Sequence, residues 1–267
     1  MIVLDNVSYS VEDDLIIKEL TLSIKKGESI AVLGSNGCGK STLAKLVDAL
    51  IVPSIGSVKV SSFDTLKPKE RRLIHREVGM VFQNPSSAFV GNTVREDIEF
   101  TLSNFSVPKC TWTECVKRTL KKVKLEGFEE RNVATLSGGE KQKLSLASIL
   151  SIDSSILIFD EALSMLDLEA KQEMLTLIRE IRLQGKTVIF ITHEIDTVLD
   201  FDKVLLLKEG KCLAFDETYK VLTNYQLLEE AEVMLPFAVK VYKDLKTKGI
   251  ILSSIPLTEA SLRKALW

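Results

Sequence analysis

A run of small and charged residues near the N-terminus has the composition of a phosphate-binding loop. Residues 34–42 read Gly-Ser-Asn-Gly-Cys-Gly-Lys-Ser-Thr, which fits the P-loop pattern. Glycines let successive backbone N–H groups point at phosphate oxygens, the lysine neutralises β- and γ-phosphate charge, and the hydroxyl ligates Mg²⁺. The predicted phosphate-binding residues are Gly34, Ser35, Asn36, Gly37, Cys38, Gly39, Lys40, Ser41 and Thr42.

Two adjacent carboxylates form a second candidate site. Residues 156–159 are apolar throughout, and Asp160 and Glu161 follow them directly. This is the Walker B arrangement, in which Asp160 would hold Mg²⁺ through water and Glu161 would face an attacking water. The two motifs together predict a P-loop NTPase, a class that includes kinases and GTPases, so they leave the type of reaction open.

Alternating strands and helices must bring these residues together. Such alternation predicts a mostly parallel sheet with helices on both faces, and sites gather at the carboxyl ends of its strands. We expect helices near 41–50 and 168–183, separated from the strands by glycine and proline. The expected core strands are 29–33, 78–82, 156–159 and 187–191.

The sequence predicts an α/β fold of the RecA-like P-loop NTPase type. Its mostly parallel core carries an antiparallel β region at the N-terminus, an inserted α-helical subdomain and a short helical extension at the C-terminus. The expected nucleotide-binding core combines 1–91 with 151–222. The helical insert is 92–150, and 223–267 forms the extension, with a possible part in dimerisation.

A third motif narrows the class. Residues 136–140, here called the signature segment, read Leu-Ser-Gly-Gly-Glu and precede a helix that includes 144–150. The segment resembles the signature of ABC (ATP-binding cassette) ATPases, and the resemblance covers residues 1–222. It implies that Ser137, Gly138 and Gly139 bind the γ-phosphate of ATP held by the P-loop of a second subunit.

The resemblance extends to the remaining motifs of that family. Gln83 matches the Q-loop glutamine, which senses Mg²⁺ and γ-phosphate, residues 164–167 match the D-loop, and His193 matches the switch histidine. The family's adenine-stacking aromatic would fall at Val11, with Tyr9 as the alternative. The implied ligands are ATP and Mg²⁺. The implied catalytic residues are Glu161, His193 and Gln83, and the implied metal ligands are Ser41, Gln83 and Asp160.

A narrower resemblance is to the ATPases of energy-coupling factor (ECF) transporters. It lies in residues 81–85 and 89–98, and again in 235–237 and 256–259. It implies an importer of a vitamin or transition-metal ion, with two ATPase subunits, identical or paralogous, on the cytoplasmic face of the cell membrane. Above them would lie a membrane coupling subunit and a substrate-binding membrane subunit. The ATPase would contact neither nucleic acid nor the transported molecule.

Charge, hydropathy and cysteine content exclude several other classes of protein. The formal net charge of -2 argues against a protein that coats nucleic acid. No apolar run approaches the ~18 residues that a membrane span needs, and no signal peptide is apparent. The four cysteines form no CxxC pair and are expected to be reduced thiols.

Three alternatives remain from the sequence. The ATPase of a conventional ABC importer shares the motifs, although 84–100 and the C-terminal residues favour the ECF type. A soluble ABC ATPase for DNA repair would need a long coiled coil, and no sustained heptads separate the P-loop from the signature segment. A non-hydrolysing scaffold would not need Glu161 and His193.

Within 84–100, the apolar residues indicate either core packing or a groove for a helix of the membrane subunit.

Overall fold

The computed structural model describes residues 1–250 and 252–267, without the side chain of Ser87. Its centre is a six-stranded sheet in the order β10-β9-β3-β8-β7-β6. The neighbours from β9 to β6 are parallel, and β10 is antiparallel to β9. The strands are β3 (Ser29–Leu33), β6 (Val78–Phe82), β7 (Ile156–Asp160), β8 (Thr187–Ile191), β9 (Lys203–Lys208) and β10 (Lys211–Glu217). The predicted core strands are therefore confirmed, and their unbroken apolar character follows from burial on both faces.

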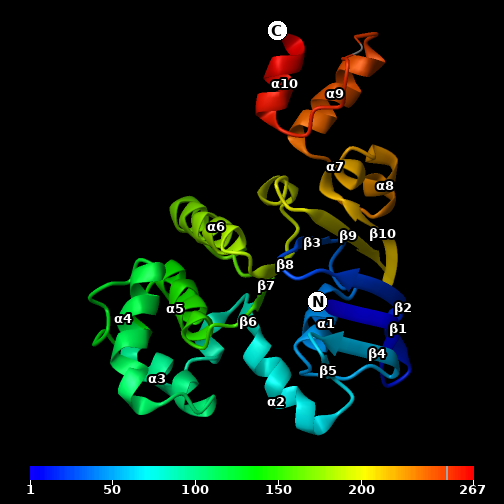
Figure 1. Cartoon of the computed structure of the whole chain (residues 1–267). Coiled ribbons are helices and arrows are strands. Elements are labelled where there is room, and N and C mark those ends of the chain that lie inside the picture. The colour runs from blue at the N-terminus through cyan, green and yellow to red at the C-terminus, as the bar shows by residue number, and fades with distance from the viewer. Residues whose placement is uncertain (251) are drawn as a thin grey trace.

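A second sheet lies beside the first, formed largely by the N-terminal residues. Its order is β2-β1-β4-β5, and all its pairs are antiparallel, which confirms the predicted antiparallel region. Helix α1 lies between the two sheets (Figure 1), and apolar residues from all three form one core cluster. The elements are β1 (Ile2–Val11), β2 (Asp14–Ile24), β4 (Ile55–Val60), β5 (Phe63–Asp64) and α1 (Lys40–Val47).

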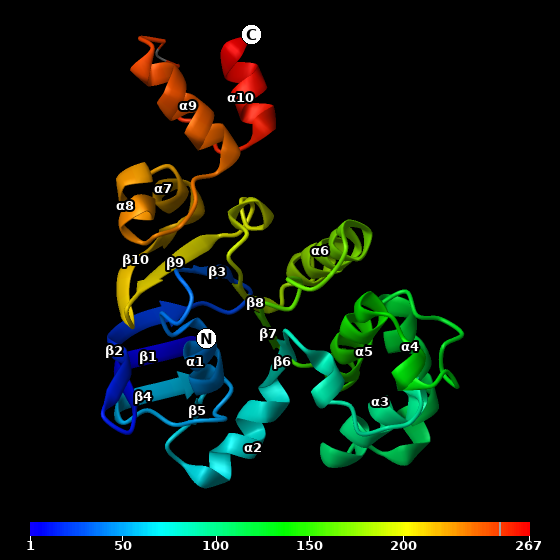
Figure 2. The same cartoon turned by 180° about the vertical axis from the view of Figure 1, so that it is seen from behind.

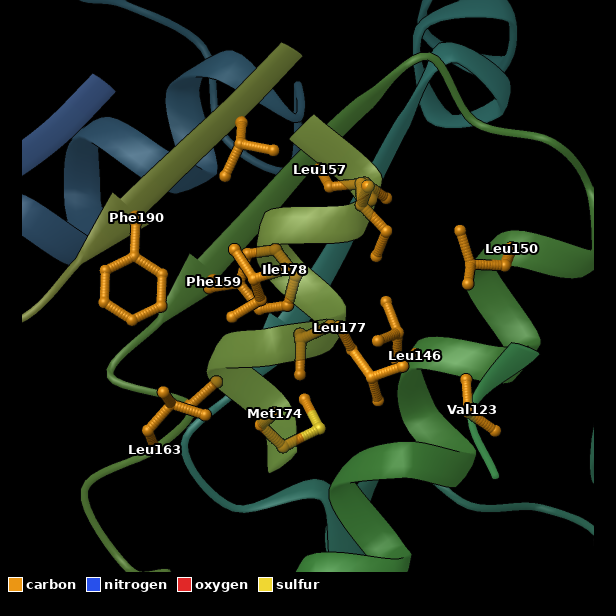
Figure 3. Packing of buried hydrophobic residues seen from close by; sticks show 14 of the residues in the cluster. Val123, Leu146, Leu150, Leu157, Phe159, Leu163, Met174, Leu177, Ile178 and Phe190 are labelled. Atoms are coloured by element: carbon orange, nitrogen blue, oxygen red, sulfur yellow. The ribbon is translucent and has the colours of Figure 1, made fainter. Parts of the chain in front are cut away.

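Helices cover the opposite face of the central sheet. Figure 3 shows Phe159 of β7 beside Ile178 of α6, and Leu146 of α5 facing Leu177 of α6. Helices α3, α4 and α5 form a group to one side of both sheets (Figure 2). The helices of this region are α3 (Val94–Asn104), α4 (Trp112–Lys122), α5 (Gly138–Ser151) and α6 (Leu168–Leu183), with short 3₁₀ turns η1 (Pro85–Ser87), η2 (Lys109–Thr111), η3 (Val133–Thr135) and η4 (Ile195–Thr197).

The C-terminal residues form four further helices. Helices α9 and α10 pack on each other away from both sheets (Figures 1 and 2). Thr258 caps the last helix, because its hydroxyl accepts a hydrogen bond from the Ser261 N–H. These helices are α7 (Thr218–Leu222), α8 (Tyr225–Glu230), α9 (Phe237–Thr247) and α10 (Glu259–Leu266).

Two details differ from the sequence expectations. Helix α1 ends at Val47, earlier than predicted, because Ala49 has a φ of 57°, which is incompatible with a continuing helix. Helix α2 (Pro68–Glu77) was not anticipated, because it is highly charged and Ile74 is its single buried residue. None of the helices in the described ranges is long and apolar enough to cross a membrane.

Candidate nucleotide-binding site

The P-loop connects the end of β3 to the start of α1, the context that the motif requires. Its backbone depends on glycine at two positions. Gly34 has a φ of +152°, and a Cβ there would lie 2.2 Å from the Leu207 carbonyl oxygen. Gly39, the residue before α1, has a φ of +105°, and a Cβ there would lie 2.7 Å from the Ile17 side chain. The two glycines let the loop turn tightly against β2 and β9.

Lys40 folds back across the loop. It is only 5% exposed, and its Nζ donates to the Gly34 and Ser35 carbonyl oxygens, each at 2.9 Å. These contacts hold a buried ammonium group at the phosphate-binding loop and satisfy two of its three donors. The Cys38 side chain points the other way, into the core between α1 and the two sheets, and burial raises the pKa of its thiol.

Ser41 and Asp160 form a pair of oxygen ligands. The Ser41 hydroxyl donates to Asp160 Oδ1 at 2.9 Å, which joins the start of α1 to the end of β7. Burial raises the pKa of the Asp160 carboxyl above its usual value, the hydrogen bond from Ser41 opposes the rise, and the charge of Glu161 adds to it. A buried carboxylate beside a hydroxyl fits Mg²⁺, which takes one or two protein oxygens together with phosphates and water.

Glu161 holds an unusual backbone conformation at the mouth of the site. Its φ is 49°, in the left-handed region, and its N–H donates to the Ile191 carbonyl oxygen at 3.1 Å. Left-handed residues other than glycine concentrate at functional sites, where neighbouring structure holds them in place. This bond anchors Glu161 between the ends of β7 and β8.

Six of the sequence-predicted site residues line one pocket of about 520 Å³. Gln83, Glu161 and His193 line it together with the loop residues Gly34 to Asn36. Gln83 Nε2 donates to the Ser164 hydroxyl at 3.1 Å, and this hydroxyl donates to the Glu161 carbonyl oxygen at 2.9 Å. Residues from the ends of β3, β6, β7 and β8 thus converge as predicted for a parallel sheet.

The signature segment lies elsewhere. Ser137 is the N-cap of α5: it accepts from the Glu140 N–H at 3.2 Å, and its own N–H donates to Glu140 Oε2 at 2.6 Å. Neither Ser137 nor Gly138 nor Gly139 lines the P-loop pocket. Figures 1 and 2 show α5 in the helical group, apart from α1. The segment therefore lies outside the nucleotide pocket of its own chain.

The pocket has one wall that sequence reasoning missed. Glu232, Val233 and Met234, between α8 and α9, line it beside His193. Glu232 has a φ of 58°, and its carboxylate lies 3.7 Å from the Lys208 ammonium group. No local motif marked these residues, because they reach the site only through the path of the chain after β10.

Neither candidate for adenine contact lines the pocket. Val11 is 51% exposed at the end of β1, and Tyr9 is half-buried against the core between the two sheets.

Comparisons with known proteins agree with this geometry. A family model described as ABC transporter matches residues 17–164. The chain is 40% identical to the energy-coupling factor transporter ATP-binding protein of Fusobacterium nucleatum, over 94% of this chain and 92% of that protein. The protein of the same name in Ligilactobacillus salivarius is 39% identical, over 98% of this chain and 94% of its own length.

Solved structures are similar as well. CbiO1 from Clostridium perfringens, part of the ABC transporter complex CbiONQ, superposes with a TM-score of 0.77 at 28% identity, over 91% of this chain and 98% of that one. A bacterial ABC transporter cassette, solved as a dimer, superposes with a TM-score of 0.74 at 26% identity, over 82% of this chain and 99% of that one. Its post-hydrolysis dimer with ADP and phosphate gives a TM-score of 0.73.

Proposed function

The chain belongs to the ABC transporter family, among the energy-coupling factor ATP-binding proteins, and from this we propose how its residues drive import of a vitamin or transition-metal ion. It is an ATPase subunit that binds and hydrolyses ATP to energise transport. The observation that carries the proposal is the convergence of Gln83, Glu161 and His193 on the pocket formed by the P-loop.

Each group in the pocket has a distinct part in phosphoryl transfer. The loop N–H groups and Lys40 would hold the phosphates, and Ser41 with Asp160 would hold Mg²⁺. Bound Mg²⁺ neutralises charge that develops on the phosphate oxygens. Glu161 would accept a proton from the attacking water, and His193 would help to place that water near the γ-phosphate. Catalysis is then mainly positioning and charge stabilisation.

The second half of each site comes from a second ATPase subunit. ABC ATPases work as dimers, and a head-to-tail pair would place the Ser137 segment of one chain over the nucleotide of the other. The position of the signature segment, outside the pocket of its own chain, supports this arrangement. The nucleotide-binding core would be 1–91 with 151–222, the signature subdomain 92–150, and the extension 223–267. The second subunit is a copy of this chain or a paralogue.

A groove beside the Q-loop is the proposed contact for a membrane subunit. Val90 is 61% exposed, and next to it Phe89, Gly91, Asn92 and Val133 line a groove of about 320 Å³. The carboxylate of Asp97, itself 6% exposed, accepts from the Val90 N–H at 3.0 Å and from the Gly91 N–H at 3.3 Å. We infer that this fixed loop receives a helix of a membrane coupling subunit, which also binds a substrate-binding subunit.

We propose that the protein lies peripherally on the cytoplasmic face of the membrane. The test is purification of the native complex from membranes, followed by identification of the co-purifying subunits. An energy-coupling factor importer should yield a coupling subunit and a membrane substrate-binding subunit. A conventional importer would instead yield paired permeases served by an external binding protein, and a soluble ATPase would yield no membrane subunit.

A further inference from the structure

Gln142 joins the signature helix α5 to the residue that follows β6. It is 2% exposed, and its Nε2 donates to the Phe82 carbonyl oxygen at 3.0 Å and to the Gln83 carbonyl oxygen at 3.1 Å. One amide group therefore holds two consecutive backbone carbonyls of the Q-loop. Gln142 is 60 and 59 residues from its two partners in the sequence, so no local pattern predicts the contact.

The orientation of this amide follows from its partners. Carbonyl oxygens only accept, so the NH₂ group must face Phe82 and Gln83, and the reversed amide would place three acceptors together. The Gln142 Oε1 atom is buried and has no hydrogen-bond partner among the described residues. A buried acceptor without a partner is unfavourable, so packing alone would favour an apolar side chain of similar size.

A second contact fixes α5 against the same strand. A Cβ on Gly79 of β6 would lie 1.8 Å from Ile149 Cγ2, so α5 packs directly against the backbone of β6 at that point. The contacts of Ile149 and Gln142 lie at different points along both elements. Helix α5 is thus held to β6 by an apolar contact near its C-terminal end and a polar contact near its N-terminal end.

We propose that Gln142 is a positioning residue that ties Gln83 to the helix that carries the signature segment. The inference rests on the proposed function, in which Gln83 acts in one nucleotide site and Ser137 acts in the site of the partner. Gln142 then makes the two sites of a dimer move as one connected unit. Loss of the connection leaves each half-site intact but impairs their joint closure.

The test compares Gln142→Met with Ser151→Ala in the full-length chain. Methionine keeps the length of the side chain and removes both donated bonds. Ser151 is a matched control, because it is also buried on α5 and donates to the Ser148 carbonyl oxygen, not to the Q-loop. The measurements are kcat and KM for ATP, nucleotide affinity, melting temperature, and ATP-dependent dimer formation in the Glu161→Gln background.

The loss of two hydrogen bonds predicts about a tenfold fall in kcat for Gln142→Met, with KM changed less than about threefold. The ATP concentration needed for dimer formation should rise by about the same tenfold factor, while single-subunit nucleotide affinity stays near wild type. Ser151→Ala should leave kcat and dimer formation near wild type, even if its melting temperature falls equally.

Two results would overturn the inference: a Gln142→Met chain with kcat within about twofold of wild type, or one whose losses equal those of Ser151→Ala. If the methionine variant does not fold, Gln142→Glu has the same shape but turns acceptors toward the two carbonyls, and it must lose kcat at least as strongly. A wild-type chain that does not hydrolyse ATP would refute the proposed function itself, which separates the two failures.

Discussion

Replacing Asp160 by asparagine should stabilise the nucleotide-free protein while removing its use of Mg²⁺. Asp160 is 9% exposed, and the Ser41 hydroxyl donates a hydrogen bond to its Oδ1 at 2.9 Å. Burial raises the pKa of Asp160, and the charge of Glu161 raises it further. Asparagine keeps an oxygen that can accept from Ser41 and removes the buried charge.

The sign of the pH dependence follows from this raised pKa. Because the folded protein holds the Asp160 proton more tightly than the unfolded chain, the free energy of unfolding falls as the pH rises from the usual aspartate range through the folded pKa. Above that pKa the full destabilisation remains. Removing one desolvated charge should add about 1 kcal/mol at neutral pH, or about 2–4 °C in melting temperature for a chain of this size.

Thermal unfolding of Asp160→Asn and wild type, at about pH 4 in the ordinary aspartate range and at about pH 8, with or without Mg-ATP, tests this reasoning. The variant should melt higher without nucleotide, with a larger difference at pH 8, and its Mg²⁺-dependent stabilisation by ATP should be lost. Ser41→Ala is the control, because it keeps the charge and removes the donor, and it should melt lower than wild type. An Asp160→Asn chain that melts below wild type at pH 8 would refute the claim that the buried charge of Asp160 destabilises the nucleotide-free protein.

Two further variants test the contacts proposed outside the pocket. Val90→Glu should weaken co-purification of the membrane coupling subunit by about tenfold or more, while the soluble ATPase rate and melting temperature stay near wild type. The control is Leu183→Glu, at an 82% exposed position on α6, and this variant should assemble normally. If Val90→Glu assembles normally, or melts lower in step with assembly, the groove is not the contact for the membrane subunit. Ser137→Arg should block ATP-dependent dimer formation, measured by light scattering, while single-subunit nucleotide binding survives. Equal loss of both would indicate misfolding or a site in the same chain.

Much of the site could be predicted because its residues follow strands. Asp160, Gln83 and His193 each come directly after or close to the end of an apolar segment, and parallel strands bring such ends to one edge. The glycine pattern of the P-loop needs no tertiary information either, since it encodes a local backbone path. Local pattern was therefore sufficient for these groups.

Contacts between distant segments could not be predicted in this way. Nothing near Gln142 indicates that its amide reaches the Q-loop, and Glu232 reaches the pocket only because the chain returns there after α8. The inward direction of Cys38 also depends on the packing of α1 between the two sheets. Helix α2 could not be predicted because it is mostly charged and lacks apolar residues at three- and four-residue spacing.

The hydrolytic role of Glu161 is tested most directly by Glu161→Gln in the full-length chain, with phosphate release and nucleotide binding measured on the same preparation. The amide keeps the size of the side chain and the Glu161 backbone bond to Ile191, but it cannot accept a proton from water. Hydrolysis should fall by about 10²-fold or more, while ATP still binds and now holds the chain as a stable dimer. A variant that releases phosphate at the wild-type rate would contradict the assignment of Glu161 as the base.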